Sequence, residues 1–587
     1  MAVRRKGLRV PFRWRYWPWL AMCGLAALAI GLGYAGFSEH LATRGESLPP
    51  LTILYLAIQL FVLESGAVAG PLPWQLDVAR FLAPVVAAWA VVQTLALVFR
   101  DEFRALCVRR WKGHTIVCGL GERGMALVRG FRDAGERVVA IESDEGNDDI
   151  ATCEELGAVV RLGRGDDPAL LASVGAHRAR RIIAVCGDDG TNLEIGTSLH
   201  WLLAAAGGSG KPPDCFVHVT DLRLCNLLRQ HRLMANTPDY LRLRMFNVYE
   251  NAARLLWNEH PLERDLSGPD DPRRPHLVIL GLGQMGESVL LQAARTAHFA
   301  NGRPLKVTVI DREADKREGS LLQRYPNLNQ VCETQFLEVD VESGSFGDRL
   351  SAWVGGDDLI RTVAVCFDDD SRSLACALAV AGKLDDAGIP VLVRMSSRRG
   401  LASLLQSEGK GAGRRLHAFG AVSRSCSREV LLGGKLDELA RAAHDDYVAN
   451  RRREGAYRED DPSLRPWEEL DEQLRESNRY QADHMAAKLR AVGCCLAPPQ
   501  PGKEPVQEFT DAEVELMARM EHARWNAERL LAGWQYGPRR DPENMRSPYL
   551  VPWEDLPEEI KEYDRQAVRN IPHLVHLAEQ RTYRNGR

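Results

Sequence analysis

Residues 114–124 read His-Thr-Ile-Val-Cys-Gly-Leu-Gly-Glu-Arg-Gly: a short apolar run followed directly by three closely spaced glycines. Residues 276–286 repeat this pattern as His-Leu-Val-Ile-Leu-Gly-Leu-Gly-Gln-Met-Gly. Where such a run is a buried strand, the first glycine makes a tight turn, the second lets a pyrophosphate approach the backbone, and the third lets the following helix pack on the strand. The free N–H groups at the start of that helix then bind phosphate. The pattern predicts two nucleotide-binding units with the candidate residues Gly119, Gly121, Gly124, Gly281, Gly283 and Gly286.

A carboxylate follows each fingerprint at the end of the next apolar run, where it can bind ribose hydroxyls. Residues 138–144 read Val-Val-Ala-Ile-Glu-Ser-Asp, and residues 307–313 read Val-Thr-Val-Ile-Asp-Arg-Glu. Glu142 and Asp311 are therefore candidate nucleotide ligands. Apolar runs that alternate with helical stretches predict a buried parallel sheet in each unit. The second unit is the weaker candidate for binding, because Arg312 places a competing cation beside Asp311 and a degenerate copy can serve structure alone.

Length and composition limit the class of protein. At 587 residues the chain is too long for one core, so several domains are expected. The net charge of −4 gives no indication of a nucleic-acid partner. The 13 cysteines show no Cys-x-x-Cys pair and no Cys/His metal spacing, so we expect reduced thiols and no metal site.

Two long apolar runs near the N-terminus predict a multi-pass membrane segment. The runs at about residues 17–37 and 78–99 are each long enough to cross a hydrocarbon core of ~30 Å. Arg and Lys crowd residues 1–16 and 100–112, and the stretch between the runs carries little positive charge. The positive-inside rule therefore places both termini in the cytoplasm. A secretory signal peptide is the competing interpretation of the first run, but no small-residue cleavage site of the expected type follows it.

A shorter apolar stretch, residues 51–64, lies between the two runs. As a helix it reaches ~21 Å, which is too short to cross a membrane. Irregular backbone at membrane depth must line a cavity or lie within protein. The order of segments is therefore that of a two-span channel subunit: a span, a re-entrant helix, a glycine-containing loop and a second span. Glu64, Ser65 and Gly66 are the candidate pore residues. The alternative is an interfacial helix in a membrane-anchored sensor.

Residues 113–430 resemble a tandem pair of RCK domains, the regulators of potassium conductance, also called Trk-type NAD-binding domains. The resemblance rests on the two fingerprints, the two carboxylates, and the strand ends Asp188-Asp189 and Asp368-Asp369-Asp370. It implies Rossmann-like units that assemble into a gating ring below an ion pore. The potassium filter signature Thr-Val-Gly-Tyr-Gly is absent, and Glu64-Ser65-Gly66 stands where it would be. A ring of Glu64 side chains would favour cations non-selectively; alternatively, Glu64 caps a loop at the outer surface.

The C-terminal part, from about residue 435, is rich in Trp, Arg, Glu and Pro and lacks the fingerprint. A helix is predicted over 511–532, with Thr510 as N-cap, Glu513 completing a capping box and Gly533 ending it.

About residues 510–575 resemble the ryanodine receptor repeat, the RyR domain. The matching stretches are His-Ala-Arg-Trp at 522–525, Gly-Trp-Gln-Tyr-Gly-Pro at 533–538 and Pro-Tyr-Leu-Val-Pro-Trp at 548–553, and Ser547 stands where the family has histidine.

The aromatic and basic residues of this module suit a nucleotide-derived messenger. Aromatic rings stack on a flat base, and arginines meet phosphates. The alternative is that the tryptophans form the core of a small helical domain while the arginines pair with nearby Glu and Asp. The candidate ligand residues are His522, Arg524, Trp525, Trp534, Tyr536 and Arg540.

These features predict four parts: a transmembrane pore-like region at 1–112, Rossmann-like α/β domains at 113–270 and 271–434, and a mainly α RyR-like domain at 435–587. We expect a ligand-gated cation channel, or channel-like membrane effector, in the plasma membrane of a prokaryote. NAD(H) or another adenine nucleotide is the expected ligand, a cation is the transported species, and a homo-oligomer, a tetramer if the family is followed, is the expected assembly. A membrane-anchored nucleotide sensor without conduction is the alternative. An NAD-dependent oxidoreductase ranks last, because no general acid or base motif such as Tyr-x-x-x-Lys lies near either fingerprint; we expect no catalytic residue.

Overall fold

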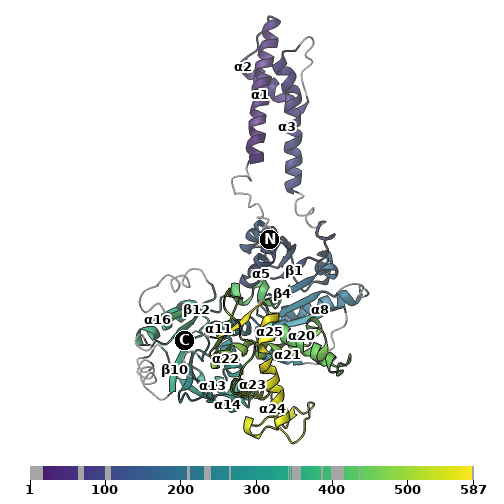
Figure 1. Cartoon of the computed structure of the whole chain (residues 1–587). Helices are drawn as coiled ribbons and strands as arrows, with labels where there is room; N and C mark the ends of the chain where they lie inside the picture. The colour runs from purple at the N-terminus through teal and green to yellow at the C-terminus, as the bar shows by residue number, and fades with distance from the viewer. Residues whose placement is uncertain are drawn as a thin grey trace. The chain divides into compact units, whose positions relative to one another are not determined.

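The computed structural model describes residues 17–63, 72–98, 107–205, 207, 212–230, 240–263, 266, 268–341, 343, 346, 358–384, 388–397, 415–434 and 436–584. The chain divides into two compact units, residues 1–110 and 111–587 (Figure 1). The predicted fold class is confirmed: a helical N-terminal segment with two candidate membrane spans, two parallel-sheet Rossmann-like domains and a helical C-terminal region. The predicted pore residues Glu64, Ser65 and Gly66 lie outside the described residues.

The described part of the first unit contains two long helices and one short helix: α1 (Trp17–Thr43), α2 (Pro50–Gln59), which continues as a 3₁₀ turn (Leu60–Val62), and α3 (Trp74–Val98). Within them, residues 19–43 and 74–95 are long and apolar enough to cross a membrane. The first helix runs six residues past the predicted end of its apolar run, since polar residues in a last turn do not by themselves end a helix. Pro50 occupies the first turn of α2, where its missing N–H costs nothing.

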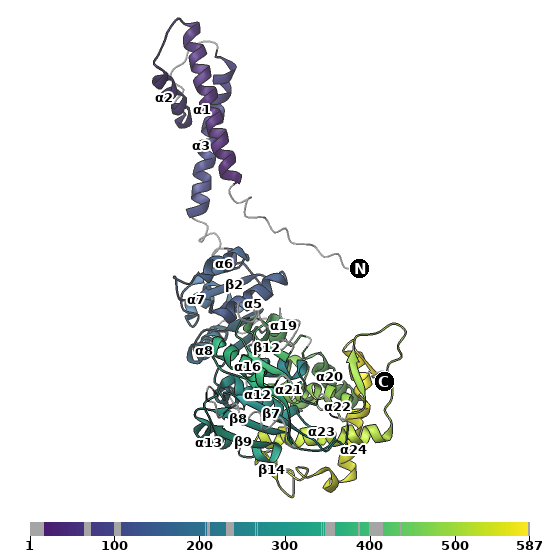
Figure 2. The same cartoon turned by 90° about the vertical axis from the view of Figure 1, so that its left-hand side faces the viewer.

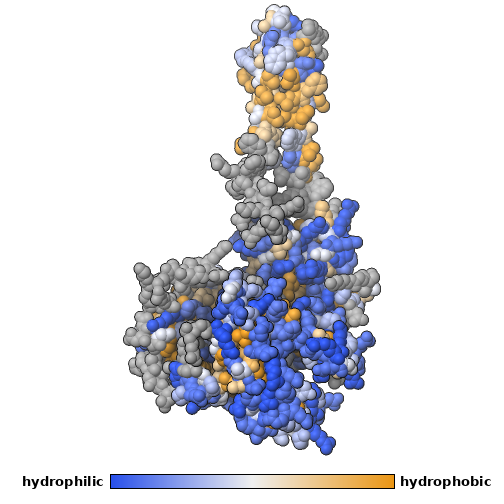
Figure 3. Space-filling view, viewed as in Figure 1, coloured by the Kyte–Doolittle hydropathy of each residue, from blue (hydrophilic) through white to orange (hydrophobic). Residues whose placement is uncertain are grey.

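Small residues let the helices of this unit pack closely. A Cβ on Gly36 would lie 2.6 Å from the backbone N of Leu76, so α1 and α3 touch backbone to backbone there. Large apolar side chains point outward instead; Leu51 and Phe81, for example, are exposed. Figure 3 shows orange, hydrophobic surface over this unit, whereas the surface of the second unit is mostly blue. An apolar exterior of this kind is stable in lipid rather than in water.

The first Rossmann-like domain is built on a six-stranded parallel sheet in the order β3-β2-β1-β4-β5-β6. This order is that of a doubly wound nucleotide-binding fold. Its strands are β1 (Thr115–Cys118), β2 (Val138–Glu142), β3 (Val159–Leu162), β4 (Arg181–Ala184), β5 (Asp214–His218) and β6 (Arg242–Phe246). Its helices are α5 (Glu122–Asp133), α6 (Asp149–Glu155), α7 (Pro168–Ser173), α8 (Asp189–Ala205) and α9 (Leu222–Gln230), and α11 (Val248–Glu259) follows the last strand.

The second domain repeats this topology, with six parallel strands in the order β12-β11-β10-β7-β8-β9. Its strands are β7 (Arg274–Leu280), β8 (Lys306–Asp311), β9 (Glu333–Glu338), β10 (Asp358–Val365), β11 (Val391–Arg394) and β12 (Leu416–Phe419). Its helices are α12 (Gln284–Thr296), α13 (Ala314–Arg324), α14 (Leu328–Val331) and α16 (Asp370–Leu384), and α18 (Val422–Ser425) and α19 (Arg428–Leu431) follow the last strand. The strands predicted after each fingerprint are thus confirmed as parallel sheets.

The two domains exchange helices after their last strands. The buried face of α11, with Ala252 and Leu256, belongs to the core around β7 and α12 of the second domain. In return, the α18–α19 segment places Cys426 and Leu431 in the core around β1 and α5 of the first domain. Each core is therefore completed by the other half of the tandem, which holds the two sheets together.

The C-terminal part is mainly helical, with two short two-stranded sheets (Figure 2). The predicted capping box is confirmed: the Thr510 side chain accepts from the Glu513 amide, and the Glu513 carboxylate accepts from the Thr510 amide. Gly533 follows the helix with a φ of +88°, a conformation that favours glycine. The elements of this part are α20 (Glu438–Arg453), α21 (Glu472–Asp483), α22 (Met485–Ala491), β13 (Cys494–Ala497), α23 (Asp511–Leu531), β14 (Gln535–Tyr536), β15 (Arg546–Ser547), α24 (Glu558–Arg569), α25 (Ile571–Leu577) and β16 (Arg581–Arg584).

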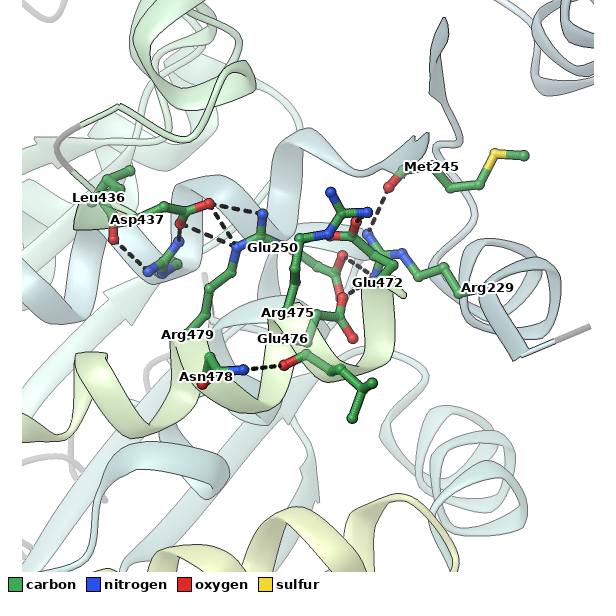
Figure 4. Close-up of polar contacts among 12 residues, drawn as sticks. Arg229, Met245, Glu250, Leu436, Asp437, Glu472, Arg475, Glu476, Asn478 and Arg479 are labelled. Atoms are coloured by element: carbon green, nitrogen blue, oxygen red, sulfur yellow. Dashed lines mark hydrogen bonds and ion pairs between the residues drawn. The ribbon is translucent and has the colours of Figure 1, made fainter. Parts of the chain in front are cut away.

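A buried cluster of arginines and carboxylates joins this part to the Rossmann-like domains (Figure 4). Asp437 accepts from Arg254 of α11 at 2.6 Å and from Arg479 of α21 at 2.8 Å. Arg229 of α9 pairs with Glu476 of α21 at 2.6 Å. Removing one partner of such a buried pair leaves a charge without compensation, so the cluster fixes α21 against the domains it contacts.

Candidate functional site

The three glycines of the first fingerprint lie at the turn from β1 into α5. Gly119 has a φ of +97°, and a Cβ on it would lie 3.0 Å from the backbone of Cys186. Gly124 faces back toward this turn, where a Cβ would lie 1.9 Å from the Gly119 oxygen. Gly121 is the N-cap of α5 and has open space in front of it. Two glycines are thus required by packing, and the middle one leaves room for a ligand beside the helix N-terminus.

Glu142 at the end of β2 holds the glycine turn in place. One carboxylate oxygen accepts from the Leu120 amide at 2.8 Å and from the Asn147 side chain at 3.1 Å. The other accepts from the Ser143 amide at 2.7 Å and the Asp144 amide at 2.9 Å. Burial alone would raise the pKa of Glu142, but these donors outweigh it and lower that pKa. All four favourable acceptor positions are in use, so a ribose hydroxyl would have to replace one of these donors.

A cavity of about 690 Å³ opens in front of α5. Small-molecule sites have volumes of roughly 300–1,000 Å³. Gly119, Gly121 and Glu142 line this first pocket, together with Arg123, whose guanidinium makes no hydrogen bond or ion pair within the described part of the chain. Free N–H groups, the positive end of the helix dipole and an unpaired arginine together favour an anion at this point.

The second domain supplies one wall of the first pocket. Met285, Arg394, Ser396 and Gly420 line it from that domain. The guanidinium of Arg394 also lies 5.5 Å from the centre of the Tyr249 ring, which faces the same cavity. The site is therefore complete only when the two domains are packed together.

The second fingerprint has the same backbone geometry but a more restricted cavity, of about 440 Å³. Gly281 has a φ of +91°, Gly283 is the N-cap of α12, and a Cβ on Gly286 would lie 2.1 Å from the Gly281 oxygen. A Cβ on Gly281 would lie 2.8 Å from the Phe367 ring, and the Arg372 guanidinium lies 4.4 Å from the centre of that ring. This aromatic ring covers the turn that a pyrophosphate would approach.

Asp311 in the second domain is paired with an arginine, although not with the one expected. Its carboxylate accepts from the Leu282 amide at 2.8 Å and lies 3.2 Å from the Nε of Arg317. Arg312 turns away and pairs with Asp340 at 2.9 Å. Arg317 lies one helical turn into the next helix, a position from which a side chain reaches back over the strand end.

The candidate ligand residues of the C-terminal module separate into buried and exposed groups. Arg524 is buried and pairs with Glu521 at 2.9 Å and with Glu528 at 2.6 Å. His522 is buried as well, and its ring lies 2.8 Å from the Val551 oxygen. Both side chains are thus committed to contacts inside the module.

Trp525 and Trp534 both lie near the guanidinium of Arg529. Arg529 is 5.6 Å from the first ring and 5.1 Å from the second, distances that allow cation–π contact with both. Tyr536 and Arg540 are exposed. The structure therefore brings the two tryptophans together with Arg529, and the exposed Tyr536 and Arg540 are free to meet a ligand.

The sequence interpretation missed the contributions of Arg123, Tyr249, Met285 and Arg394 to the first pocket. Arg123 lies inside the fingerprint, so its charge beside the phosphate position could have been noticed. The other three come from elements that follow the motif by more than 100 residues, and no local signal points to them.

Two family models match parts of the chain: the TrkA-N domain at residues 115–206 and the RyR domain at residues 505–579. No curated protein matches the chain. Solved structures with some similarity include "GsuK channel bound to NAD", at 15% identity over 84% of this chain and 88% of that chain with a TM-score of 0.37. "Crystal structure of the GsuK bound to ADP" has 17% identity over 71% and 97% of the two chains, with a TM-score of 0.36. A dipicolinate synthase from Bacillus halodurans has 12% identity over 55% and 96%, with a TM-score of 0.21.

The TM-scores with the solved structures are too low for any conclusion about this chain. The two family matches agree with the first parallel sheet and with the α23–α25 region. The chain contains a TrkA-N domain at residues 115–206 and a RyR domain at residues 505–579.

Proposed function

We propose that this chain is one subunit of a nucleotide-gated cation channel in the plasma membrane of a prokaryote, with both termini in the cytoplasm. The observation that carries the proposal is the first pocket, an anion-attracting cavity in a TrkA-N domain whose wall is shared by two domains. Among its described residues the same chain has two helices that are long and apolar enough to cross a membrane.

The ligand of the first pocket is NAD(H) or another adenine nucleotide. Its phosphates meet the N-terminus of α5, where Gly121 leaves the backbone accessible and Arg123 supplies an unpaired charge. Its ribose displaces the Asn147 side chain from Glu142, because Asn147 donates from a side chain, whereas Leu120, Ser143 and Asp144 donate from backbone amides. The second pocket is smaller and covered by Phe367, so we assign it a lesser role in binding.

The pore requires several chains, since two helices cannot enclose a channel. A closed ring of identical subunits can enclose a pore, and we propose a ring of four copies. Glu64, Ser65 and Gly66 remain the proposed residues of the ion path. A nucleotide that binds one arrangement of the paired domains better than another shifts the population toward it by that difference in affinity. The chain thus acts as a gate rather than as an enzyme.

The RyR domain offers a second ligand surface. We propose that Tyr536 and Arg540, which are exposed, together with the edge of Trp534 receive a nucleotide-type ligand there. His522 and Arg524 hold the module together instead, because their polar atoms are engaged internally.

The test is cation flux through liposomes that contain the purified full-length protein. Flux that depends on NAD⁺, NADH, ADP or ATP is expected, and Gly121→Leu, which fills the open space in front of α5, should abolish the dependence on the ligand of the first pocket. Nucleotide binding without any flux would establish a sensor instead and would refute the channel. Turnover of NADH with a carbonyl substrate would refute the non-enzymatic assignment.

A further inference from the structure

The carboxyl end of the second sheet lies between the two fingerprint pockets. Phe367 and Asp368, just after β10, line the second pocket. Arg394, the last residue of β11, lines the first. Its Nη1 donates to the Phe367 oxygen at 3.0 Å and forms an ion pair with the Asp368 carboxylate. One arginine thus faces the first pocket while it is bonded to the wall of the second.

The two partners of the Arg394–Asp368 ion pair differ in how far they are buried. The Arg394 side chain is 10% exposed, whereas the Asp368 side chain is 79% exposed. A carboxylate that remains largely in water attracts a cation only weakly. The buried guanidinium is therefore incompletely compensated, and a phosphate brought into the first pocket can replace Asp368 as its partner.

An anion at α5 would lie opposite this arginine. Glu122, in the first turn of α5, lines the first pocket together with Arg394. Burial, followed by the negative charge of Asp370, raises the pKa of Glu122, so the start of α5 faces the carboxyl end of the second sheet. Asp370 is itself held in place by the backbone amide and hydroxyl of Ser396, two residues beyond Arg394.

We infer that Arg394 binds the phosphates of a nucleotide in the first pocket and releases Asp368 toward the second, so that occupancy of the first pocket opposes anion binding in the second. The inference rests on the proposed nucleotide site in front of α5. A Cβ on Gly283, the N-cap of α12, would lie 3.7 Å from an Asp368 oxygen. The Asp368 carboxylate thus already lies near that positive helix end, and once Arg394 no longer neutralises its charge it opposes a second anion there.

The direction in which Asp368→Asn changes the affinity for ADP distinguishes this exchange from a structural role of Arg394. Asp368→Asn removes the competing charge, so ADP is expected to bind the first pocket of the full-length protein several-fold more tightly. Arg394→Gln is expected to weaken ADP at least ten-fold, and in the double variant the gain from Asp368→Asn should disappear. Asp133→Asn serves as the control, because it removes an exposed carboxylate at the end of α5 that lines neither pocket. The measurement is isothermal titration with ADP, repeated with NAD⁺.

The outcomes separate this inference from the proposed function. Wild-type protein that binds ADP but gains nothing from Asp368→Asn would overturn the exchange and leave the nucleotide site standing. The same holds if Asp368→Asn still tightens binding in the Arg394→Gln background. Wild-type protein that binds neither ADP nor NAD⁺ would overturn the nucleotide site itself. Because Asp368 is exposed, its variant should fold even if Arg394→Gln does not; Arg394→Lys, which keeps the charge, is then the second test and should retain most of the affinity.

Discussion

Replacing Gly124 by alanine should destabilise the first Rossmann-like domain, and the reason is a single contact. The added Cβ would lie 1.9 Å from the Gly119 oxygen, a separation that real Cβ atoms do not show. The helix must therefore move by about 1 Å, and such overpacking costs about 3 kcal/mol when the neighbour is backbone. Alanine in a helix recovers about 1 kcal/mol relative to glycine. A net loss of about 2 kcal/mol should lower the apparent Tm by about 4–8 °C for a domain of this size.

Gly121→Ala is the matched control, because the middle glycine has nothing within 4 Å of its Cβ position. Its cost is that of a poorer N-cap, about 1 kcal/mol at most, and its larger effect should be on nucleotide affinity. Differential scanning fluorimetry of both full-length variants, followed by titration with ADP, measures the two effects separately. Equal stability of Gly124→Ala and the wild type would refute the packing argument, and unchanged ADP affinity of Gly121→Ala would refute the role of the open helix N-terminus.

Three further changes test other parts of the molecule. Gly36→Ala should disrupt the contact of α1 with Leu76 and lower the Tm in detergent, whereas Gly31→Ala, which has open space around it, should not; equal effects would contradict the packing. Asp437→Asn should cost about 1–3 kcal/mol in chemical unfolding, because Arg254 and Arg479 lose the carboxylate that they share and keep only Asp483 and Glu472; no measurable loss would contradict the role of the cluster. Burial lowers the pKa of His218 to about 3, so the unfolded chain binds a proton that the folded chain does not, and stability should fall as pH drops from 6.5 toward 3, by up to about 1.4 kcal/mol per pH unit. His218→Phe should flatten the dependence of stability on pH in thermal unfolding measured between pH 7 and 5. An unchanged dependence would refute its attribution to His218.

Much of the fold could be predicted because its signals are local. Each fingerprint follows a continuous apolar run, and such a run in a parallel sheet is buried on both faces. The capping box of Thr510 and Glu513 is equally local, and both expectations are confirmed. The exchange of α11 with the α18–α19 segment could not be predicted. An amphipathic helix shows which face it buries, but its sequence does not show which sheet that face covers.

The candidate site could be predicted only where the motif itself carries the chemistry. Gly121 and Arg123 lie inside the fingerprint, so their place beside a phosphate follows from the motif. Arg394 lies about 270 residues away and reaches the first pocket only because the tandem domains pack together. The engagement of Glu142 by backbone amides depends on the path of the loop after β2, which residue types alone do not determine.

Gating of a cation pore by a nucleotide in the first pocket can be measured as the current across a planar bilayer that contains the full-length protein. ADP or NAD⁺ is washed in and out on the side of the soluble unit. We expect a cation current that changes reversibly with the nucleotide in the wild type and does not respond in Gly121→Leu. A membrane that stays silent with every nucleotide offered, or a current that ignores the nucleotide in both proteins, would contradict nucleotide gating.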